Sequence, residues 1–317
     1  MDKHEWTSSG NGTHPTSCAG AASHAVSKNV GFGFGFPEQA VATIELHGSA
    51  EIERVVVRDG GADIGQGAHT VLAQMTASAC DVSLDKVAWD ASDTAIAPNS
   101  GATSASCLTR MVGGAIQGAA ELALHKWWDE ERPAIATYQY HPQATTDLDA
   151  ETGAGVPNFA YGYVAQYVEV EVDVETGHMH VPNVVCAVDA GRAINPQQVE
   201  GQIEGAVVQA HGYAIQENFI MEGGFVSTPY LSNYLLPTAL DTPRCVQSVI
   251  LEIPPRPGRA MECPRRCLNG LSPLCGGGRR CAVRRHWSLA QRFSPDARPR
   301  ACCALRSSQG RRAHFID

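Results

Sequence analysis

The stretch that decides the fold is YVAQYVEVEVDVETGHMHVPNVVCAVDAG followed by RAINPQQVEGQIEGAVVQ, which together run from Tyr163 to Gln209. Apolar and polar residues alternate on both sides of a turn at Glu175 to Gly177, a pattern typical of a β-hairpin. Asn195 and Pro196 then read as a helix N-cap and a first-turn proline. Apolar residues recur at helical spacing beyond them, at Val199, Ile203, Val207, Ala210 and Ala214. The sequence therefore predicts a hairpin followed by a helix.

The first half of the chain repeats this arrangement. The run VATIELHGSAEIERVVVRD, residues 41–59, alternates around a turn near Gly48 and predicts another hairpin. We expect a helix from about His69 to Cys80, a strand at VAWDASD (87–93), and a long helix over about 104–127. The long helix should bury a stripe made of Leu108, Val112, Ala115, Ala119 and Leu122. A hairpin paired with one or two helices in each half predicts an α+β fold of two lobes.

These patterns divide the chain into four parts. Residues 29–135 should form the first lobe and residues 136–253 the second. Residues 1–28 are rich in Ser, Gly, His and Ala without a usable period, so we expect a disordered or poorly packed leader. Residues 254–317 form a basic tail, which holds fourteen of the 24 Lys and Arg residues but only three of the 33 acidic ones.

Composition narrows the class of protein. Hydrophobic residues make up 44% of the chain and charged residues 18%, which fits a globular protein. No apolar run reaches the roughly 20 residues of a membrane span, and five cysteines scattered singly before the tail resemble reduced, buried thiols. We therefore expect a cytoplasmic protein that does not contact a membrane. Six cysteines in the tail lack the paired spacing of zinc sites, and its arginines lack a nucleic-acid-binding module, so neither a zinc module nor nucleic-acid binding is favoured.

Three segments beside predicted helices carry candidate chemistry. Gly65-Gln66-Gly67 precedes the first helix, where small residues should leave backbone N–H groups bare for an anion. Gly101 to Ser106 opens the long helix in a similar way, and Gln202 lies in the helix that begins near Pro196. A single glycine- or serine-rich helix start is usually only a cap. The occurrence of all three in one chain is what favours a binding site.

Four strings carry a resemblance to a known family. They are DIGQGAHTVLAQ (63–74), ASDTAIAPNSGATSAS (91–106), AVDAGRAINPQQVEGQIEGAVVQ (187–209) and NYLLPTALDTP (233–243). In this order they resemble successive motifs in the C-terminal half of the molybdopterin-binding large subunit of the xanthine dehydrogenase/aldehyde oxidase family. The resemblance extends over about residues 30–253. It implies a molybdenum-dependent oxidoreductase that oxidises a purine, an aldehyde or an N-heterocycle with water as the oxygen source.

The resemblance also implies site residues, cofactors and partners. Gly65, Gln66 and Gly67 would contact a molybdenum–molybdopterin cofactor, expected as the cytosine dinucleotide, and Gln202 would lie near its molybdenum end. The phosphates would be bound by Thr103, Ser104, Ala105 and Ser106. Partner subunits would carry iron–sulfur clusters and FAD. Because the family's large subunit has another cofactor-contacting half upstream, the chain alone is expected to be inactive.

The tail departs from the family pattern. Glu262, in the segment PGRAMECP (257–264), is the candidate general base by its Glu-x-Pro pattern, although a chance glutamate explains it equally well. The run RRHWSLAQRFSPDARPRACCAL (284–305) matches the out-of-frame reading of a typical family C-terminus, so we expect a frameshift before it. The alternative to an enzyme fragment is a non-catalytic remnant or a basic-tailed interaction protein.

Overall fold

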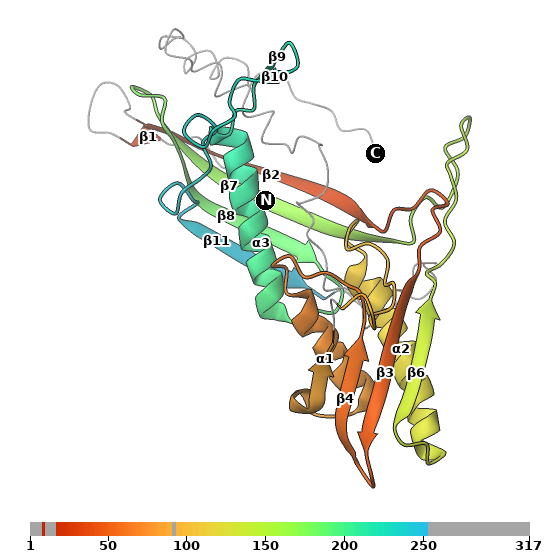
Figure 1. Ribbon diagram of the computed structural model, residues 1–317. Helices are drawn as coiled ribbons and strands as arrows, with labels where there is room; N and C mark the ends of the chain where they lie inside the picture. The colour runs from red at the N-terminus through yellow and green to blue at the C-terminus, as the bar shows by residue number, and fades with distance from the viewer. Residues whose placement is uncertain (1–7, 10–16, 91–92, 253–317) are drawn as a thin grey trace.

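The computed structural model describes residues 8–9, 17–90 and 93–252. Within these residues the chain forms a five-stranded sheet in the order β1-β2-β7-β8-β11 and a four-stranded sheet in the order β5-β4-β3-β6. Figure 1 shows the two sheets as separate layers, with α1 and α2 beside the four-stranded sheet and α3 across the five-stranded one. The predicted α+β fold with two lobes is confirmed.

The first lobe is built around the predicted hairpin of β3 and β4. Its elements are β3 (Ala40–Gly48), β4 (Ile52–Arg58), α1 (Ala68–Cys80), a short 3-10 helix (Leu84–Lys86), β5 (Val87–Trp89), α2 (Leu108–Trp128) and β6 (Ala134–Tyr140). Helix α2 packs on β3, β6 and α1. Val112, Ala115 and Ala119 of its predicted stripe are completely buried, but Leu122 is 45% exposed. The prediction for Leu122 is wrong because the buried face passes through Ile116, Ala120 and Ala123 instead.

The second lobe contains the other predicted hairpin, with α3 across its sheet. Its elements are β1 (Ser8–Ser9), β2 (Ser17–Val30), β7 (Ala160–Asp173), β8 (Met179–Asp189), α3 (Pro196–His211), a π-helical turn (Gly212–Gln216) and β11 (Cys245–Leu251), with a small ribbon of β9 (Met221–Glu222) and β10 (Phe225–Val226) nearby. The Asn195 side chain accepts a hydrogen bond from the Gln198 amide, so the predicted N-cap is confirmed. Val199, Ile203 and Val207 are buried.

The predicted leader is wrong for residues 17–28. These residues belong to β2, which pairs antiparallel with β7 from Ser17 opposite Asp173 to Val30 opposite Ala160. Its small residues show no apolar period because only Val30 at its end is buried, and backbone pairing rather than side-chain burial fixes its position. The second lobe is therefore discontinuous in sequence, since β2 precedes the whole first lobe.

The predicted boundary between the lobes is also misplaced. The sequence predicts that residues 136–140 begin the second lobe, but they form β6 with the two residues before them. This strand pairs with β3 from Leu46 opposite Ala134 to Ala40 opposite Tyr140. The turn-rich sequence after residue 140 hid this edge strand, in which several side chains are exposed.

Candidate functional site

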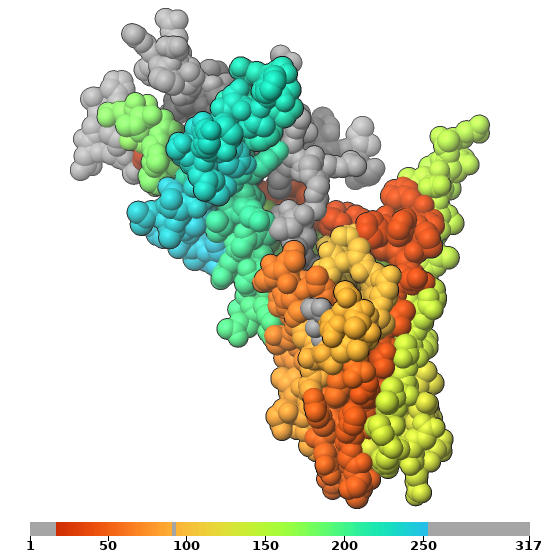
Figure 2. Space-filling model, viewed as in Figure 1, coloured from red at the N-terminus to blue at the C-terminus, as the bar shows by residue number. Residues whose placement is uncertain are grey.

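Segments from both lobes meet at the entrances of the helices. The Asn195 side chain, just before α3, donates to the Gln74 side chain of α1 over 3.4 Å. An added Cβ on Gly67, the N-cap residue just before α1, would lie 2.5 Å from the Gln198 side chain of α3. Figures 1 and 2 show this junction, where the lower end of α3 lies against α1. The loop before α1 and the start of α3 thus form one surface.

Most backbone donors of the loop of residues 60–67 are paired with side-chain acceptors, some within the loop and some outside it. The Asp63 carboxylate accepts from the amides of Gly65 (2.9 Å), Gly67 (3.2 Å) and His69 (3.1 Å). The amide of Gly60 donates to the Ser100 hydroxyl over 2.7 Å. The expectation of bare N–H groups around Gly65 to Gly67 is therefore wrong, because Asp63 places an anion at the entrance of α1.

Gln66 also bonds within this loop. Its Oε1 accepts from the Ile64 amide over 2.7 Å, and its Nε2 donates to the Ala62 carbonyl over 3.0 Å. Both ends of the side-chain amide are used, so Gln66 shapes the loop in this state. The second N–H of Nε2 and the second lone pair of Oε1 remain for a contact with a ligand.

The segment of residues 101–106 lies directly beside that loop. The Thr103 hydroxyl accepts a hydrogen bond from the Ala62 amide over 2.9 Å. Ala105 and Ser106 both have left-handed backbone conformations, with φ of 50° and 58°. The Ala105 carbonyl accepts from the Gly31 amide over 2.9 Å, which ties the segment to the glycine-rich loop after β2. The structure therefore brings two of the three predicted segments together.

The entrance of α2 differs from that of α1. Its N-cap residue is Cys107, whose side chain makes no capping hydrogen bond to the helix. The Cys107 amide donates to the Ser104 carbonyl, and the first-turn amides of a helix lack intrahelical acceptors. Together with the partial positive charge of a helix start, this entrance is better suited to an anion than the one that Asp63 occupies.

The third predicted residue, Gln202, lies one turn beyond Gln198 on α3. Residues four apart share one face of a helix, so Gln202 follows the side chain that contacts Gly67. Gln202 is half-buried, and the Oε1 atom of Gln198 is buried without a hydrogen-bond partner among the described residues. An unpaired buried acceptor is costly, so Gln198 Oε1 favours a ligand that donates a hydrogen bond to it.

Sequence reasoning missed three residues behind the loop, namely Asp59, Trp89 and His69. The Asp59 carboxylate is completely buried and accepts from the Gly61 amide (2.8 Å) and from Trp89 Nε1 (2.9 Å). The His69 ring meets the Trp89 ring edge to face, with centroids 3.3 Å apart. Burial raises the pKa of Asp59, although its two hydrogen bonds oppose the shift, and burial lowers the pKa of His69 to about 4. An aspartate at the end of a strand was the only signal in the sequence.

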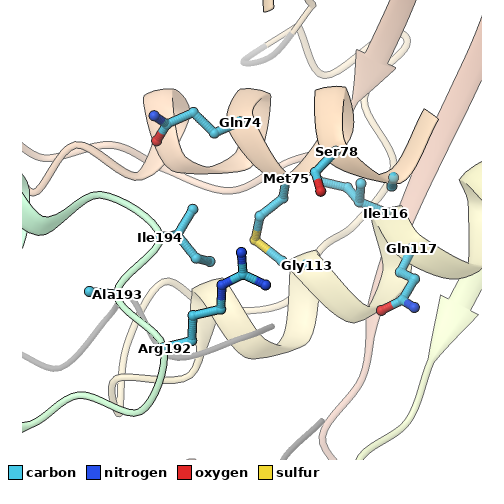
Figure 3. A pocket seen from close by; sticks show the side chains of 10 residues that line it. Gln74, Met75, Ser78, Gly113, Ile116, Gln117, Arg192, Ala193 and Ile194 are labelled. Carbon is cyan, nitrogen blue, oxygen red and sulfur yellow. The ribbon is translucent and has the colours of Figure 1, made fainter. Parts of the chain in front are cut away.

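A cavity of about 220 Å³ lies between α1, α2 and the loop from β8 to α3. Figure 3 shows Arg192 reaching from that loop toward Met75 of α1, with Gln74, Ser78 and Gln117 nearby. The cavity is smaller than the roughly 300–1,000 Å³ typical of small-molecule sites. It marks the seam between the lobes.

Several sequence predictions fall outside the described residues. Glu262 and the whole tail of residues 254–317 are among them. Within residues 8–9, 17–90 and 93–252, no cluster of three His, Cys, Asp or Glu side chains is arranged to hold a metal ion. No helix in this part of the chain is long and apolar enough to cross a bilayer. Three of the five cysteines before the tail, Cys80, Cys107 and Cys186, are buried free thiols as expected, but Cys245 is exposed.

The fold and the joined helix entrances define a two-lobed α+β protein with a candidate binding surface where its lobes meet. The family model described as the molybdopterin cofactor-binding domain matches residues 3–129 and 121–243. The chain belongs to this family. A xanthine dehydrogenase from Oryza sativa subsp. japonica is 30% identical over 200 residues, which cover 57% of this chain and 14% of the relative. The gamma subunit of the 6-hydroxypseudooxynicotine dehydrogenase complex from Paenarthrobacter nicotinovorans is 30% identical over 257 residues, covering 68% of this chain and 32% of the relative.

Solved structures show the same fold. The aldehyde oxidoreductase from Desulfovibrio gigas superposes with a TM-score of 0.68 and 25% identity, over 82% of this chain and 29% of that chain. Quinoline 2-oxidoreductase from Pseudomonas putida 86 superposes with a TM-score of 0.65 over 81% of this chain and 37% of that one. The chain therefore spans about a third or less of the relatives whose sequences it matches. Its homologues are molybdenum oxidoreductases.

Proposed function

We propose that this chain forms part of the cofactor cradle of a molybdenum hydroxylase large subunit. The observation that carries the proposal is the hydrogen bond from the Ala62 amide to the Thr103 hydroxyl, which joins two segments expected to contact one cofactor. Gly67 against Gln198 adds the start of α3 to the same surface. When bound, the molybdenum cofactor supplies two-electron oxidation of a substrate, with the oxygen drawn from water.

The three segments would contact different parts of the cofactor. The phosphates of a pterin dinucleotide belong at the uncapped start of α2, beside Thr103, Ser104, Ala105 and Ser106, because Asp63 already occupies the start of α1. Gly65, Gln66 and Gly67 then shape the wall next to it. Donor groups of a pterin ring would satisfy the unpaired Gln198 Oε1, and Gln202 would face the metal end. The residues present thus fit the group through backbone donors and amide side chains.

The reaction and the partners belong to the same proposal. The substrate is a purine, an aldehyde or an N-heterocycle, Glu262 acts as the general base, and partner subunits carry the iron–sulfur clusters and FAD. The Paenarthrobacter relative is named as a subunit of a dehydrogenase complex, which supports a multisubunit assembly. The cytosine dinucleotide form of the cofactor, a cytoplasmic location and inactivity without an upstream half complete the proposal, and they rest on the sequence.

Metal content tests the proposal. The chain should be co-expressed with a polypeptide that supplies the upstream half of a large subunit, then purified and assayed for molybdenum and for pterin fluorescence. We expect close to one molybdenum per chain, and a marked loss of molybdenum in Gln202→Ala. Gln209→Ala, two turns further along α3, is the matched control and should retain the metal. Absence of molybdenum from the wild-type complex would instead favour a non-catalytic remnant.

A further inference from the structure

Asp59 lies behind the loop of residues 60–67, and the proposed function assigns it no role. We propose that Asp59, acting through Trp89 and His69, is a positioning residue that fixes this loop against the segment of residues 101–106. The inference deepens the proposed function, since the two segments are the walls of the proposed cradle. It rests on contacts that exist without any cofactor.

Asp59 is held as a buried acceptor on both oxygens. Oδ1 accepts from the Gly61 amide and Oδ2 accepts from Trp89 Nε1, at 2.8 Å and 2.9 Å. Its exposed fraction is 0%. Burying a carboxylate is costly unless its oxygens are satisfied, and here each oxygen faces an N–H donor. The carboxylate therefore links the loop to β5, which ends at Trp89.

Gly61 is fixed at both of its polar atoms. Its amide donates to Asp59, and its carbonyl lies 3.1 Å from His69 Nε2. Since burial keeps the pKa of His69 near 4, the ring is neutral at pH 7, and the contact requires the proton to be on Nε2. The His69 ring in turn packs on Trp89, which also donates to Asp59. Asp59 and His69 therefore each contact Gly61, and Trp89 supports both of them.

The position of Gly61 determines how the two walls meet. The next residue, Ala62, donates its amide to Thr103 and accepts Gln66 Nε2 at its carbonyl. Gly61 has little room to move, because an added Cβ would lie 2.9 Å from both Asp59 Oδ1 and Leu108 Cδ1. A shift of Gly61 would therefore separate Ala62 from Thr103. Asp59 is thus connected to Ala62 by a short path, the hydrogen bond to the Gly61 amide and the peptide bond that follows.

An asparagine cannot replace this carboxylate. Its single carbonyl oxygen satisfies either the Gly61 amide or Trp89 Nε1, and its NH₂ group then faces the other donor. Trp89→Phe complements this change, because it removes the Nε1 donor and keeps an aromatic ring for His69. Both variants break the same link from opposite ends.

Amide hydrogen exchange in the cofactor-free full-length chain tests the proposal. The Ala62 amide is the most informative probe, because it does not touch Asp59. Asp59→Asn and Trp89→Phe should each speed its exchange by about tenfold, as expected for losing a bond to a charged acceptor. The double variant should exceed neither single variant by much, and Asp85→Asn, an exposed acid of the same lobe, should leave the exchange unchanged.

Two results would overturn the proposal. One is unchanged exchange at Ala62 in both single variants. The other is uniformly faster exchange across β3, β4 and α2, which would mean that Asp59 only stabilises the lobe as a whole. If Asp59→Asn fails to fold, Trp89→Phe decides alone.

Molybdenum content separates this inference from the proposed function. In the co-expressed complex, Asp59→Asn should retain less than half of the wild-type molybdenum after dialysis. Equal retention would refute a positioning role in the cradle while leaving the proposed function intact. A wild-type complex without molybdenum, but with faster Ala62 exchange in the variants, would refute the proposed function and support the positioning of the loop.

Discussion

Asp63→Asn tests how the start of α1 is stabilised. The carboxylate accepts from three amides, those of Gly65, Gly67 and His69, at 2.9, 3.2 and 3.1 Å. Burial raises the pKa of Asp63, but these three bonds and the nearby His69 outweigh it, so the pKa is lowered overall. The charged form of Asp63 is therefore bound more favourably in the folded chain than in the unfolded one.

The magnitude follows from the number and exposure of these bonds. Loss of an N-cap side chain costs about 0.5–2 kcal/mol. Because Asp63 is only partly buried and water screens its charge, we expect about 1 kcal/mol for Asp63→Ala. Asp63→Asn should cost less, since it keeps one acceptor oxygen. With a urea slope of about 2 kcal/mol/M, the midpoint for Asp63→Ala should fall by about 0.5 M.

The loss of stability in Asp63→Asn should depend on pH, which makes the prediction specific. A carboxyl whose pKa is depressed in the folded state stabilises the chain above its unfolded pKa of 3.8, and this stability is lost as the pH falls through the folded value. Urea unfolding followed by circular dichroism should therefore show a constant gap between wild type and Asp63→Asn from pH 7 to 5, and a shrinking gap below pH 4. Glu53→Gln, an exposed acid on β4, is the control. A gap as large at pH 3 as at pH 7 would refute the reasoning.

Three further predictions concern the same lobe. Burial lowers the pKa of His69 from 6.5 to about 4, so the unfolded chain takes up a proton that the folded chain resists, and stability should fall as the pH drops from 6.5 to 4. In thermal unfolding, His69→Gln should reduce this fall of the melting temperature with pH. An unchanged dependence of the melting temperature on pH would contradict the prediction. Burial raises the pKa of Cys80 to about 12, so iodoacetamide at pH 8 should label the exposed Cys245 and spare Cys80, as mass spectrometry of the folded chain would reveal. Gly67→Ala should destabilise the chain more than Gly65→Ala in a urea titration. Both glycines have positive φ, but only at Gly67 would a Cβ collide with a side chain of α3. Equal losses of stability would contradict this and leave backbone strain as the whole cause.

Periodicity predicted the elements whose burial follows a strict pattern. The β7–β8 hairpin alternates around its turn, and α3 buries Val199, Ile203 and Val207 at helical spacing, so their positions were readable. Strands β2 and β6 were missed for the opposite reason. They pair with strands far away in sequence, and exposed side chains interrupt their apolar pattern.

The candidate site was only partly predictable for a related reason. Small residues marked the loop of residues 60–67 and the segment of residues 101–106, but sequence alone assigned no partners to their amides. The Asp63 carboxylate and the Thr103 hydroxyl take those amides through bonds that depend on the folded path of the loop. Asp59 carries no motif, and its partner Trp89 lies 30 residues further along the chain.

The polar side chains around the loop share one task, which is to accept hydrogen bonds from its backbone. Ser100, only 3% exposed, accepts from the Gly60 amide and donates to the Val41 carbonyl, while Asp59 and Thr103 accept from the next two amides. Each acceptor serves a particular amide, so replacing one leaves a donor unpaired and moves its neighbours. The side chain of Ile64, in contrast, is 84% exposed and contributes nothing to this pattern. The loop is therefore specified mainly by side chains outside its exposed tip, and substitutions at Ile64 should leave its shape intact while those at Ser100 should not.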